Sequence, residues 1–332
     1  MSKKVVVTGG TGFVGAHVVQ KLVERGDRVT VLVRPTSNTS LLEDLPVETV
    51  VGDITNFESL LSPLGEAEEV YHVAADYRLW ARDPREIYRN NVDGTRNVLE
   101  AARRCRVRKV VYTSTVGCLG LSRGVESADE STPVSRDELV GNYKKSKFDA
   151  ERLALEYAAN GLDVVVVNPS TPVGPGDIKP TPTGKMILDF VNGKMAGYVD
   201  TGLNLVAVED VAAGHLLAAE KGQTGQRYIL GNRNMSFRQI LESLARISDR
   251  KAPSLRIPHS LALAAAVVDT AKSRALGTEP GITIEGVVMS RKKMYYCSGK
   301  AVNELELPQS SVEDALTRAV RWFEENGYVK RP

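Results

Sequence analysis

The first half of the chain alternates short runs of β-branched residues with longer amphipathic stretches. The short runs are apolar at nearly every position, which is typical of strands covered by helices on both faces. Strands are predicted at residues 4–8, 28–33, 47–51, 69–72, 109–113 and 163–167. Helices are predicted at about 12–25, 84–105 and 141–160. This order predicts an α/β fold with a Rossmann-type, doubly wound parallel sheet.

The regular alternation ends after Asn168. Residues 169–184 hold five prolines and three glycines, which predicts a long loop. A late strand is expected at 227–230, and helices at 236–247, 260–275 and 312–326. We therefore expect an NAD(P)-binding domain at 1–168 plus about 205–231. A smaller C-terminal substrate-binding lobe would take about 169–204 and 232–332.

A glycine-rich segment follows the first strand and opens the first helix. It satisfies both GxGxxG and TGxxGxxG. Glycine permits positive φ and a close approach of backbone to a pyrophosphate, and the helix N-terminus offers free N–H groups. The alternative is a purely structural turn. The segment predicts a dinucleotide site that includes Gly9, Thr11, Gly12, Phe13, Val14 and Gly15.

The end of the second strand bears on the choice of cofactor. An NAD-selective site would carry an acid about 20 residues past the glycines, to hold the ribose 2′-hydroxyl. Arg34 stands there instead, and the next acid is Glu43. A cation can pair with a 2′-phosphate, and Ser37 could donate to it, so NADP is favoured and NAD stays possible in principle.

The ends of the third and fourth strands supply further candidates for cofactor binding. Asp53, followed by Ile54, lies where a carboxylate could accept from the adenine amino group. Val73, Ala74 and Ala75 have small side chains that would let backbone pass close to the cofactor.

Tyr143 and Lys147 are candidates for acid–base chemistry. Their i, i+4 spacing places them on one helix face. A tyrosine with a pKa near 10 is a poor base at neutral pH, and a nearby ammonium would lower that pKa. Tyr143 and Lys147 are also expected to contact the cofactor, because Lys147 could donate to the nicotinamide ribose hydroxyls. Ser114 and Thr115 follow the fifth strand, where a hydroxyl could polarise a substrate oxygen. Taken alone, the YxxxK spacing is common, and an ordinary surface face of a helix would be its default interpretation.

Together, the glycine motif, the Tyr143–Lys147 pair and the preceding Ser/Thr resemble the extended short-chain dehydrogenase/reductase superfamily. Residues 73–80, 168–175 and 178–184 resemble one subgroup of it, the bacterial hopanoid-associated sugar epimerases, which is itself similar to dihydroflavonol 4-reductases. The resemblance implies that Thr115 is the catalytic hydroxyl, in place of the commoner serine, with Ser114 beside it. It also implies that Pro169 and Ser170 flank the nicotinamide. Asn91 would tie the sheet to the catalytic region.

Composition and charge narrow the classes of partner. The formal net charge is only +2 over 332 residues, so the composition gives no reason to expect the clustered Lys and Arg of a nucleic-acid-binding surface. The three cysteines are far apart, which fits a reducing compartment and predicts no metal site. The longest apolar run, 261–268, is far short of the roughly 20 residues that span a bilayer. We expect a cytoplasmic protein with a small-molecule substrate, no nucleic-acid partner and no integral membrane segment. A homodimer is compatible with these observations.

Three functions fit these residues. The first is an NADP(H)-dependent reductase that interconverts a carbonyl and a secondary alcohol. The second is a sugar-nucleotide epimerase or dehydratase that retains NAD(P) and returns the hydride. The third is a non-catalytic dinucleotide sensor, which would have no use for Tyr143 and Lys147. Tyr77, Arg78 and Trp80 fit either a substrate-pocket wall or a packed loop.

Overall fold

Seven parallel strands form the central sheet of the computed structural model, which describes residues 2–78, 80–122, 127–276, 278 and 280–330. Their spatial order is β3 (Glu48–Val51), β2 (Arg28–Val33), β1 (Lys4–Thr8), β4 (Glu69–His72), β5 (Lys109–Thr113), β6 (Val164–Pro169) and β9 (Arg227–Leu230). Every neighbouring pair is parallel. This order confirms the predicted Rossmann-type α/β fold.

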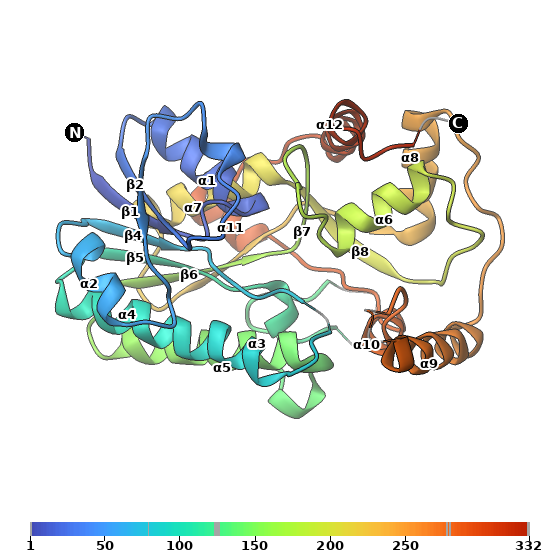
Figure 1. Cartoon of the computed structure of the whole chain (residues 1–332), viewed down its shortest axis with the longest axis horizontal. Helices are drawn as coiled ribbons and strands as arrows, with labels where there is room; N and C mark the ends of the chain where they lie inside the picture. Colours follow the sequence, from blue (N-terminus) through green and yellow to red (C-terminus); the bar gives the residue numbers. More distant parts are fainter. Residues whose placement is uncertain (1, 79, 123–126, 277, 279, 331–332) are drawn as a thin grey trace.

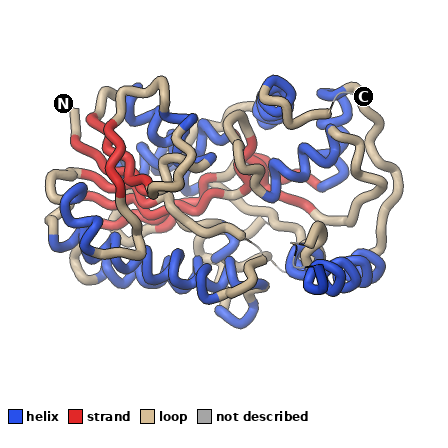
Figure 2. Tube along the Cα trace, viewed as in Figure 1, coloured by secondary structure: helices blue, strands red, loops and turns tan. Residues whose placement is uncertain are grey.

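Helices cover both faces of this sheet, as Figures 1 and 2 show. One face carries α1 (Phe13–Glu24), α7 (Val208–Lys221) and α11 (Gly299–Leu305). The other carries α2 (Glu58–Leu64), α4 (Gly94–Arg104) and α5 (Gly141–Ala159). Val5 and Val7 of β1 belong to the first core and Val6 to the second. Both faces of the strand are buried, which explains its continuous run of valine.

A second sheet lies beside the first, in the right half of Figure 1. Its order is β10 (Arg233–Ser236), β8 (Gly202–Ala207) and β7 (Thr171–Val173). A separate apolar core joins it to α6 (Pro182–Val191), α8 (Phe237–Ser248) and α12 (Val312–Glu325). The remaining helices are α9 (His259–Leu276) and α10 (Ile284–Met289), which pack on each other, and short 3₁₀ turns at Ser40–Leu42, Val116–Cys118 and Arg136–Glu138.

Residues 169–184 are not one long loop, so that prediction is wrong. They contain β7 and the first turn of α6. Thr181 caps α6 by accepting from the backbone N–H of Gly184 at 3.1 Å, and Pro182 occupies the first turn. Proline suits that position because its missing N–H would have no partner inside the helix. Here proline begins a helix rather than prolonging a loop.

The single helix predicted at 84–105 is interrupted. It is built as α3 (Arg85–Tyr88), a π-helical segment (Arg89–Asp93) and α4. Asn91 lies in the π segment and is buried. Its Nδ2 donates to the carbonyl of Asp76 and to Ser146 Oγ, both at 2.9 Å. The π segment therefore holds together the loop after β4 and the start of α5, the tie that the resemblance implies for Asn91.

Glu69 anchors the edge of the sheet opposite the glycine loop. It is only 2% exposed, and ion pairs join it to Lys3 at 2.7 Å, to Arg25 at 3.3 Å and to Arg108 at 3.1 Å. Tyr71 Oη donates to it at 3.0 Å. Burial raises the pKa of Glu69, but the Lys3 contact and the other donors outweigh burial and hold the pKa below its usual value.

Replacing Glu69 by Gln should lower the free energy of unfolding by about 2–3 kcal/mol at pH 7. This is below the usual cost of breaking a fully buried pair, because the partner cations are partly exposed. The unfolded pKa is about 4.3, and the folded one is lower. The stabilisation is therefore present above pH 4.3 and is lost as the pH falls through the folded pKa. Urea unfolding at pH 7 and pH 3.5 should show the gap between wild type and variant shrink in acid.

The matched control for this prediction is Glu66→Gln. Glu66 pairs with Lys4, but its side chain is 78% exposed, so its loss should leave stability unchanged. Equal losses in the two variants would contradict the assigned role of Glu69.

Candidate active site

The glycine loop is pressed against the end of β4. Gly9 has φ +74°, and a Cβ there would lie 2.5 Å from the backbone nitrogen of Ala74. A Cβ at Gly15 would lie 2.0 Å from the carbonyl oxygen of Gly9. Gly12 is different, because a Cβ there would meet only Gly9 O, at 3.3 Å. The inner side of the loop is closed, and its outer side at Gly12 has room for a ligand.

The first turn of α1 faces that open side. Phe13, Val14 and Gly15 begin the helix, and Thr11 lies just before its N-cap, Gly12. The first N–H groups of a helix have no partner inside it, and they carry the positive end of its dipole. This geometry fits a pyrophosphate.

Arg34, Ser37 and Asp53 lie past the ends of β2 and β3, at the same edge of the sheet as the glycine loop. The backbone N–H of Arg34 donates to Ser37 Oγ at 3.0 Å, and the Arg34 side chain is exposed. Asp53 Oδ1 accepts from the backbone and hydroxyl of Thr55, each at 2.8 Å. Ile54 packs against α4 at Gly94. The structure thus brings these predicted cofactor residues along one edge.

His72 ends β4 between two hydroxyls. Its Nδ1 lies 2.7 Å from Thr8 Oγ1, and its Nε2 lies 3.0 Å from Thr95 Oγ1. Burial, with a smaller contribution from the charge of Lys147, lowers the pKa of His72 to about 3. The ring is therefore neutral and fixed at both nitrogens, which suits a packing role and not a base.

Thr115 and Ser114 point in different directions after β5. The Thr115 hydroxyl accepts from the backbone N–H of Gly117 at 3.1 Å and lies close enough to the Tyr143 hydroxyl to lower the pKa of that tyrosine. Ser114 Oγ instead donates to Cys118 Sγ at 3.6 Å. Of the two predicted hydroxyls, that of Thr115 is the one that acts on Tyr143.

Lys147 is almost fully buried on α5, one turn after Tyr143. Its Nζ donates to Tyr112 Oη at 2.8 Å and to the Thr113 carbonyl at 2.7 Å, and burial lowers its pKa to about 8. Burial also raises the pKa of Tyr143, and the Thr115 hydrogen bond offsets only part of that rise. The expectation that Lys147 lowers the pKa of Tyr143 is not met in this structure, because Lys147 Nζ is directed to Tyr112 and Thr113 while desolvation raises the pKa of Tyr143. Tyr143 therefore holds its proton at neutral pH.

Two buried polar atoms at the end of β6 have no hydrogen-bond partner within the described part of the chain. They are Asn168 Oδ1 and Ser170 Oγ. Leaving such an atom unpaired costs about 1–3 kcal/mol, so a ligand that pairs with it gains that amount. Pro169 lies between them and is fixed beside Leu230 of β9. These atoms fit the nicotinamide end of a dinucleotide whose pyrophosphate rests on the glycine loop.

Sequence reasoning did not single out Asn168 or Glu151 as site residues. Asn168 Nδ2 donates to the Thr115 carbonyl at 3.1 Å and to Glu151 Oε2 at 2.7 Å. Both side chains are buried, so they fix the backbone that carries Thr115. The available signal was an asparagine that closes a run of four valines.

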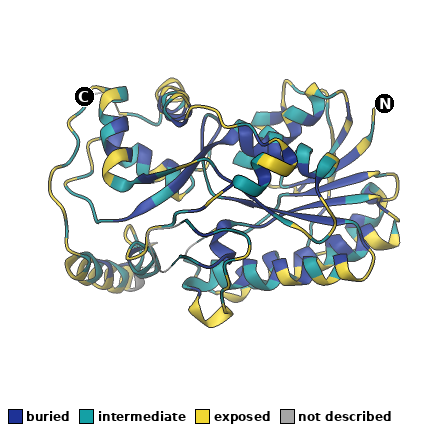
Figure 3. Ribbon diagram, turned by 180° about the vertical axis from the view of Figure 1, so that it is seen from behind, coloured by how far each residue is buried: buried dark blue, intermediate teal, exposed yellow. Residues whose placement is uncertain are grey.

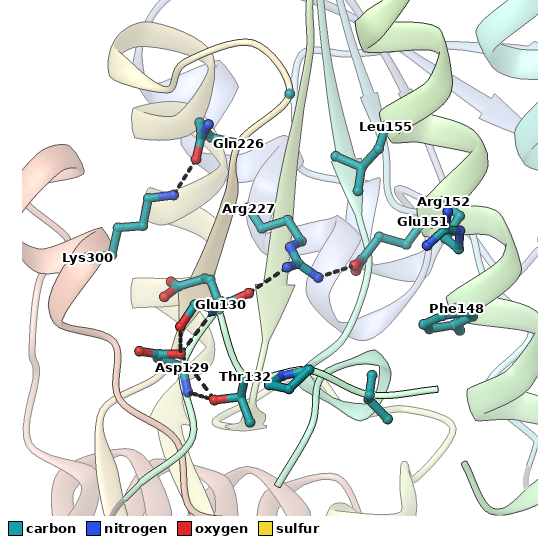
Figure 4. A pocket seen from close by; sticks show the side chains of 14 residues that line it. Asp129, Glu130, Thr132, Phe148, Glu151, Arg152, Leu155, Gln226, Arg227 and Lys300 are labelled. Carbon is teal, nitrogen blue, oxygen red and sulfur yellow. Dashed lines mark hydrogen bonds and ion pairs between the residues drawn. The ribbon is translucent and has the colours of Figure 1, made fainter. Parts of the chain in front are cut away.

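Behind Glu151 lies an open cavity of about 710 Å³, shown in Figure 4. Arg227 crosses it and pairs with Glu151 at 3.3 Å, while Lys300 donates to Gln226 at 2.7 Å. None of the predicted site residues lines this cavity. Glu151 lines the cavity and also accepts from Asn168 Nδ2, which connects the cavity to the backbone at Thr115.

The predicted substrate-side segment is largely paired with itself. Arg78 contacts Asp76 at 2.6 Å and Glu86 at 3.1 Å, and Tyr77 Oη donates to the carbonyl of Lys179 at 3.3 Å. Leu79 lies outside the described residues. Arg78 is thus held by carboxylates, which favours the packed-loop interpretation for this side chain.

The chain is similar to known proteins, and two of them align with 98% of it. Residues 5–231 match the model of the NAD dependent epimerase/dehydratase family. A Synechocystis protein named "Putative dihydroflavonol 4-reductase" is 48% identical over 98% of this chain and 95% of its own length. "Sterol demethylase protein B" of Methylococcus capsulatus is 34% identical over 98% of this chain and 99% of its own.

Solved structures agree with this relationship. The crystal structure of gox2253 superposes with a TM-score of 0.89 at 44% identity, covering 99% of this chain and 100% of the other. A nucleoside-diphosphate-sugar epimerase from Pseudomonas aeruginosa superposes with a TM-score of 0.81 at 25% identity, over 99% and 100% of the two chains. The chain therefore belongs to the NAD-dependent epimerase/dehydratase family and is an NAD(P)-dependent enzyme of the extended short-chain dehydrogenase/reductase type.

Proposed function

We propose that this enzyme is an NADP(H)-dependent oxidoreductase that interconverts a carbonyl and a secondary alcohol, with Tyr143 as the general acid and base. One observation carries the proposal. The hydroxyl of Thr115, at the end of β5, lies close enough to the Tyr143 hydroxyl to affect its pKa, and Tyr143 keeps its proton at neutral pH. A protonated acid next to a second hydroxyl suits the reduction of a carbonyl.

Different residues of this chain would bind the cofactor, orient it and transfer the proton in such a reaction. The glycine loop and the first turn of α1 would bind the pyrophosphate, while Ser170 and the Asn168 amide would orient the nicotinamide. When bound, the cofactor supplies the hydride. Thr115 and Tyr143 would bind the substrate oxygen, and Tyr143 Oη would release its proton to that oxygen as negative charge develops there. Lys147, buried one turn further along α5, would donate to the nicotinamide ribose hydroxyls and so hold the cofactor beside Tyr143.

The position of Arg34 supports NADP(H) as the cofactor that is bound and released in each turnover. The Arg34 side chain is exposed at the end of β2, where an acid would favour NAD. A guanidinium pairs well with a phosphate, and the Ser37 hydroxyl is held next to it. The reductase name of the 48% identical relative agrees with this choice. We also propose that the unit built on the second sheet binds the substrate, which is a small molecule.

An epimerase or dehydratase with retained NAD(P) is the second candidate. The family name and the epimerase from Pseudomonas aeruginosa favour it. The two functions differ in net redox change, since an epimerase returns its hydride and consumes no cofactor. A non-catalytic sensor would leave the Tyr143–Thr115 pair without a use. The three free, well-separated cysteines support the proposal that the enzyme works in the reducing cytoplasm. A homodimer stays a prediction.

The deciding experiment measures how much dinucleotide co-purifies with the enzyme and how much added NADPH the enzyme consumes. Purified enzyme should release little dinucleotide on denaturation and should oxidise added NADPH stoichiometrically with members of a ketone and aldehyde panel. Tightly retained dinucleotide, together with no NADPH consumption across the panel, would favour the epimerase instead.

Arg34→Ala should weaken the binding of NADPH by about 1–3 kcal/mol, roughly 5- to 150-fold, and should leave the affinity for NADH nearly unchanged. The reason is that only NADPH carries the 2′-phosphate. Fluorescence titration of both cofactors into both proteins measures the two affinities. Arg28→Ala is the matched control, because Arg28 is exposed at the other end of β2. Equal wild-type affinities for NADPH and NADH would refute the preference for NADP.

Tyr143→Phe should fold and bind NADPH normally and lose about 10²–10⁴-fold in kcat, since the ring packs and only the proton is lost. Thr115→Ala should cost more than Ser114→Ala, and Thr115→Ser should stay active, because the paired hydroxyl is that of Thr115. Lys147→Ala should lose turnover and also weaken cofactor binding. Steady-state kinetics and cofactor titration separate these effects.

The control on the same helix is Tyr157→Phe, whose hydroxyl contacts only Glu100 among the hydrogen bonds of the described residues, at 3.4 Å. This variant should keep full activity. A fully active Tyr143→Phe on any accepted substrate would disprove the mechanism, whatever the substrate is.

A further inference from the structure

Large apolar side chains are exposed mainly in one segment. Of the eight such residues in the described chain, six lie between 255 and 282. They are Leu255, Leu261, Val267, Val268, Leu276 and Ile282, with exposed fractions from 46% to 69%. A cluster of this kind commonly marks a surface that contacts a partner or a membrane.

Helix α9 organises this cluster into one face. Leu261, Val268, Lys272 and Leu276 recur at helical spacing with the exposed alanines 264, 265, 271 and 275. Figure 3 shows exposed positions along the whole length of α9. The helix packs against α10 on its other side. We call the exposed stripe, with the flanking Leu255 and Ile282, the α9 face.

The segment that carries the α9 face is also strongly basic. Residues 250–293 hold eight Lys and Arg against three Asp and Glu, a net charge of +5, whereas the rest of the chain is net negative. Lys272 lies within the stripe, where its alkyl chain can lie along apolar surface while its ammonium reaches out. Arg291, Lys292 and Lys293 are exposed just after Ser290, whose carbonyl lies 3.0 Å from His259 at the start of α9.

The opposite side of α9, which packs on α10, leads toward the catalytic helix. A Cβ at Gly141, the first residue of α5, would lie 3.4 Å from Cγ of Glu285 on α10. Lys144 Nζ reaches Met294 Sδ at 3.9 Å, just past the basic run.

We propose that the α9 face docks the enzyme on an anionic lipid membrane. Apolar side chains would enter the interface between headgroups and acyl chains, and the surrounding cations would contact acidic headgroups. The attachment would be peripheral, since none of the helices in the described ranges has the length and apolarity to cross a bilayer. A twofold contact between two copies is disfavoured, because it would bring the same cations of each copy together.

Vesicle co-sedimentation of the whole chain tests this proposal without substrate or cofactor. Wild type should bind phosphatidylcholine vesicles containing 30% phosphatidylglycerol and should bind pure phosphatidylcholine at least 10-fold more weakly. Raising the salt to 0.5 M should also weaken binding, because it screens the cations. The double variant Leu261→Glu, Val268→Glu should lose binding at least 10-fold. It should keep the wild-type melting temperature, because both side chains are exposed.

Val51→Glu is the matched control, because Val51 is 64% exposed but lies on β3, far from α9 in sequence. It should bind vesicles like wild type. Two results would overturn the proposal: no binding of wild type to acidic vesicles, or equal binding by the double variant. Sedimentation that shows a wild-type dimer converted to monomers by the double variant would also overturn it and would assign the face to a second copy. None of these outcomes bears on the proposed reductase activity.

Discussion

The whole cofactor edge depends on one close approach of backbone to backbone. Gly9 has no room for a side chain against Ala74, and Gly15 has none against Gly9. These contacts set the N-terminus of α1 directly above the ends of β1 and β4. Because every strand is parallel, the ends of β2, β3, β5 and β6 lie at the same edge. Arg34, Asp53, Thr115 and Ser170 therefore follow strand ends along the same edge of the sheet as the glycine loop.

Desolvation governs the chemistry at the catalytic end of that crevice. It keeps Tyr143 protonated, and it lowers the pKa of Lys147 to about 8, so that the ammonium keeps its charge at pH 7 but gives up its proton more readily than an exposed lysine. The same burial makes His72 neutral. Hydrogen bonds to Tyr112 Oη and to the Thr113 carbonyl hold Lys147 in place.

The parts of the fold that sequence predicts well are those with a strong local signal. The continuous valines of β1 and β6 and the glycine motif indicate the sheet and its ligand edge directly. The second sheet was not predicted, because β7 and β10 are only three and four residues long. Each of them pairs with β8, which lies at a distance in the sequence. The π segment at Asn91 was not predicted, because residues 89–93 contain no proline or glycine that would mark it in the sequence. The choice between Ser114 and Thr115, and the direction of the Tyr143 pKa, depend on tertiary contacts that no spacing encodes.

Ser170 occupies an unusual place between the two sheets. It is the only residue between the end of β6 and the start of β7, so the chain passes from the cofactor sheet to the second sheet through it. A rotation of the second sheet relative to the first would turn the backbone at Ser170, and with it the buried hydroxyl that has no partner among the described residues. If that hydroxyl orients the nicotinamide, as proposed above, any movement of the second sheet would also move a contact of the cofactor.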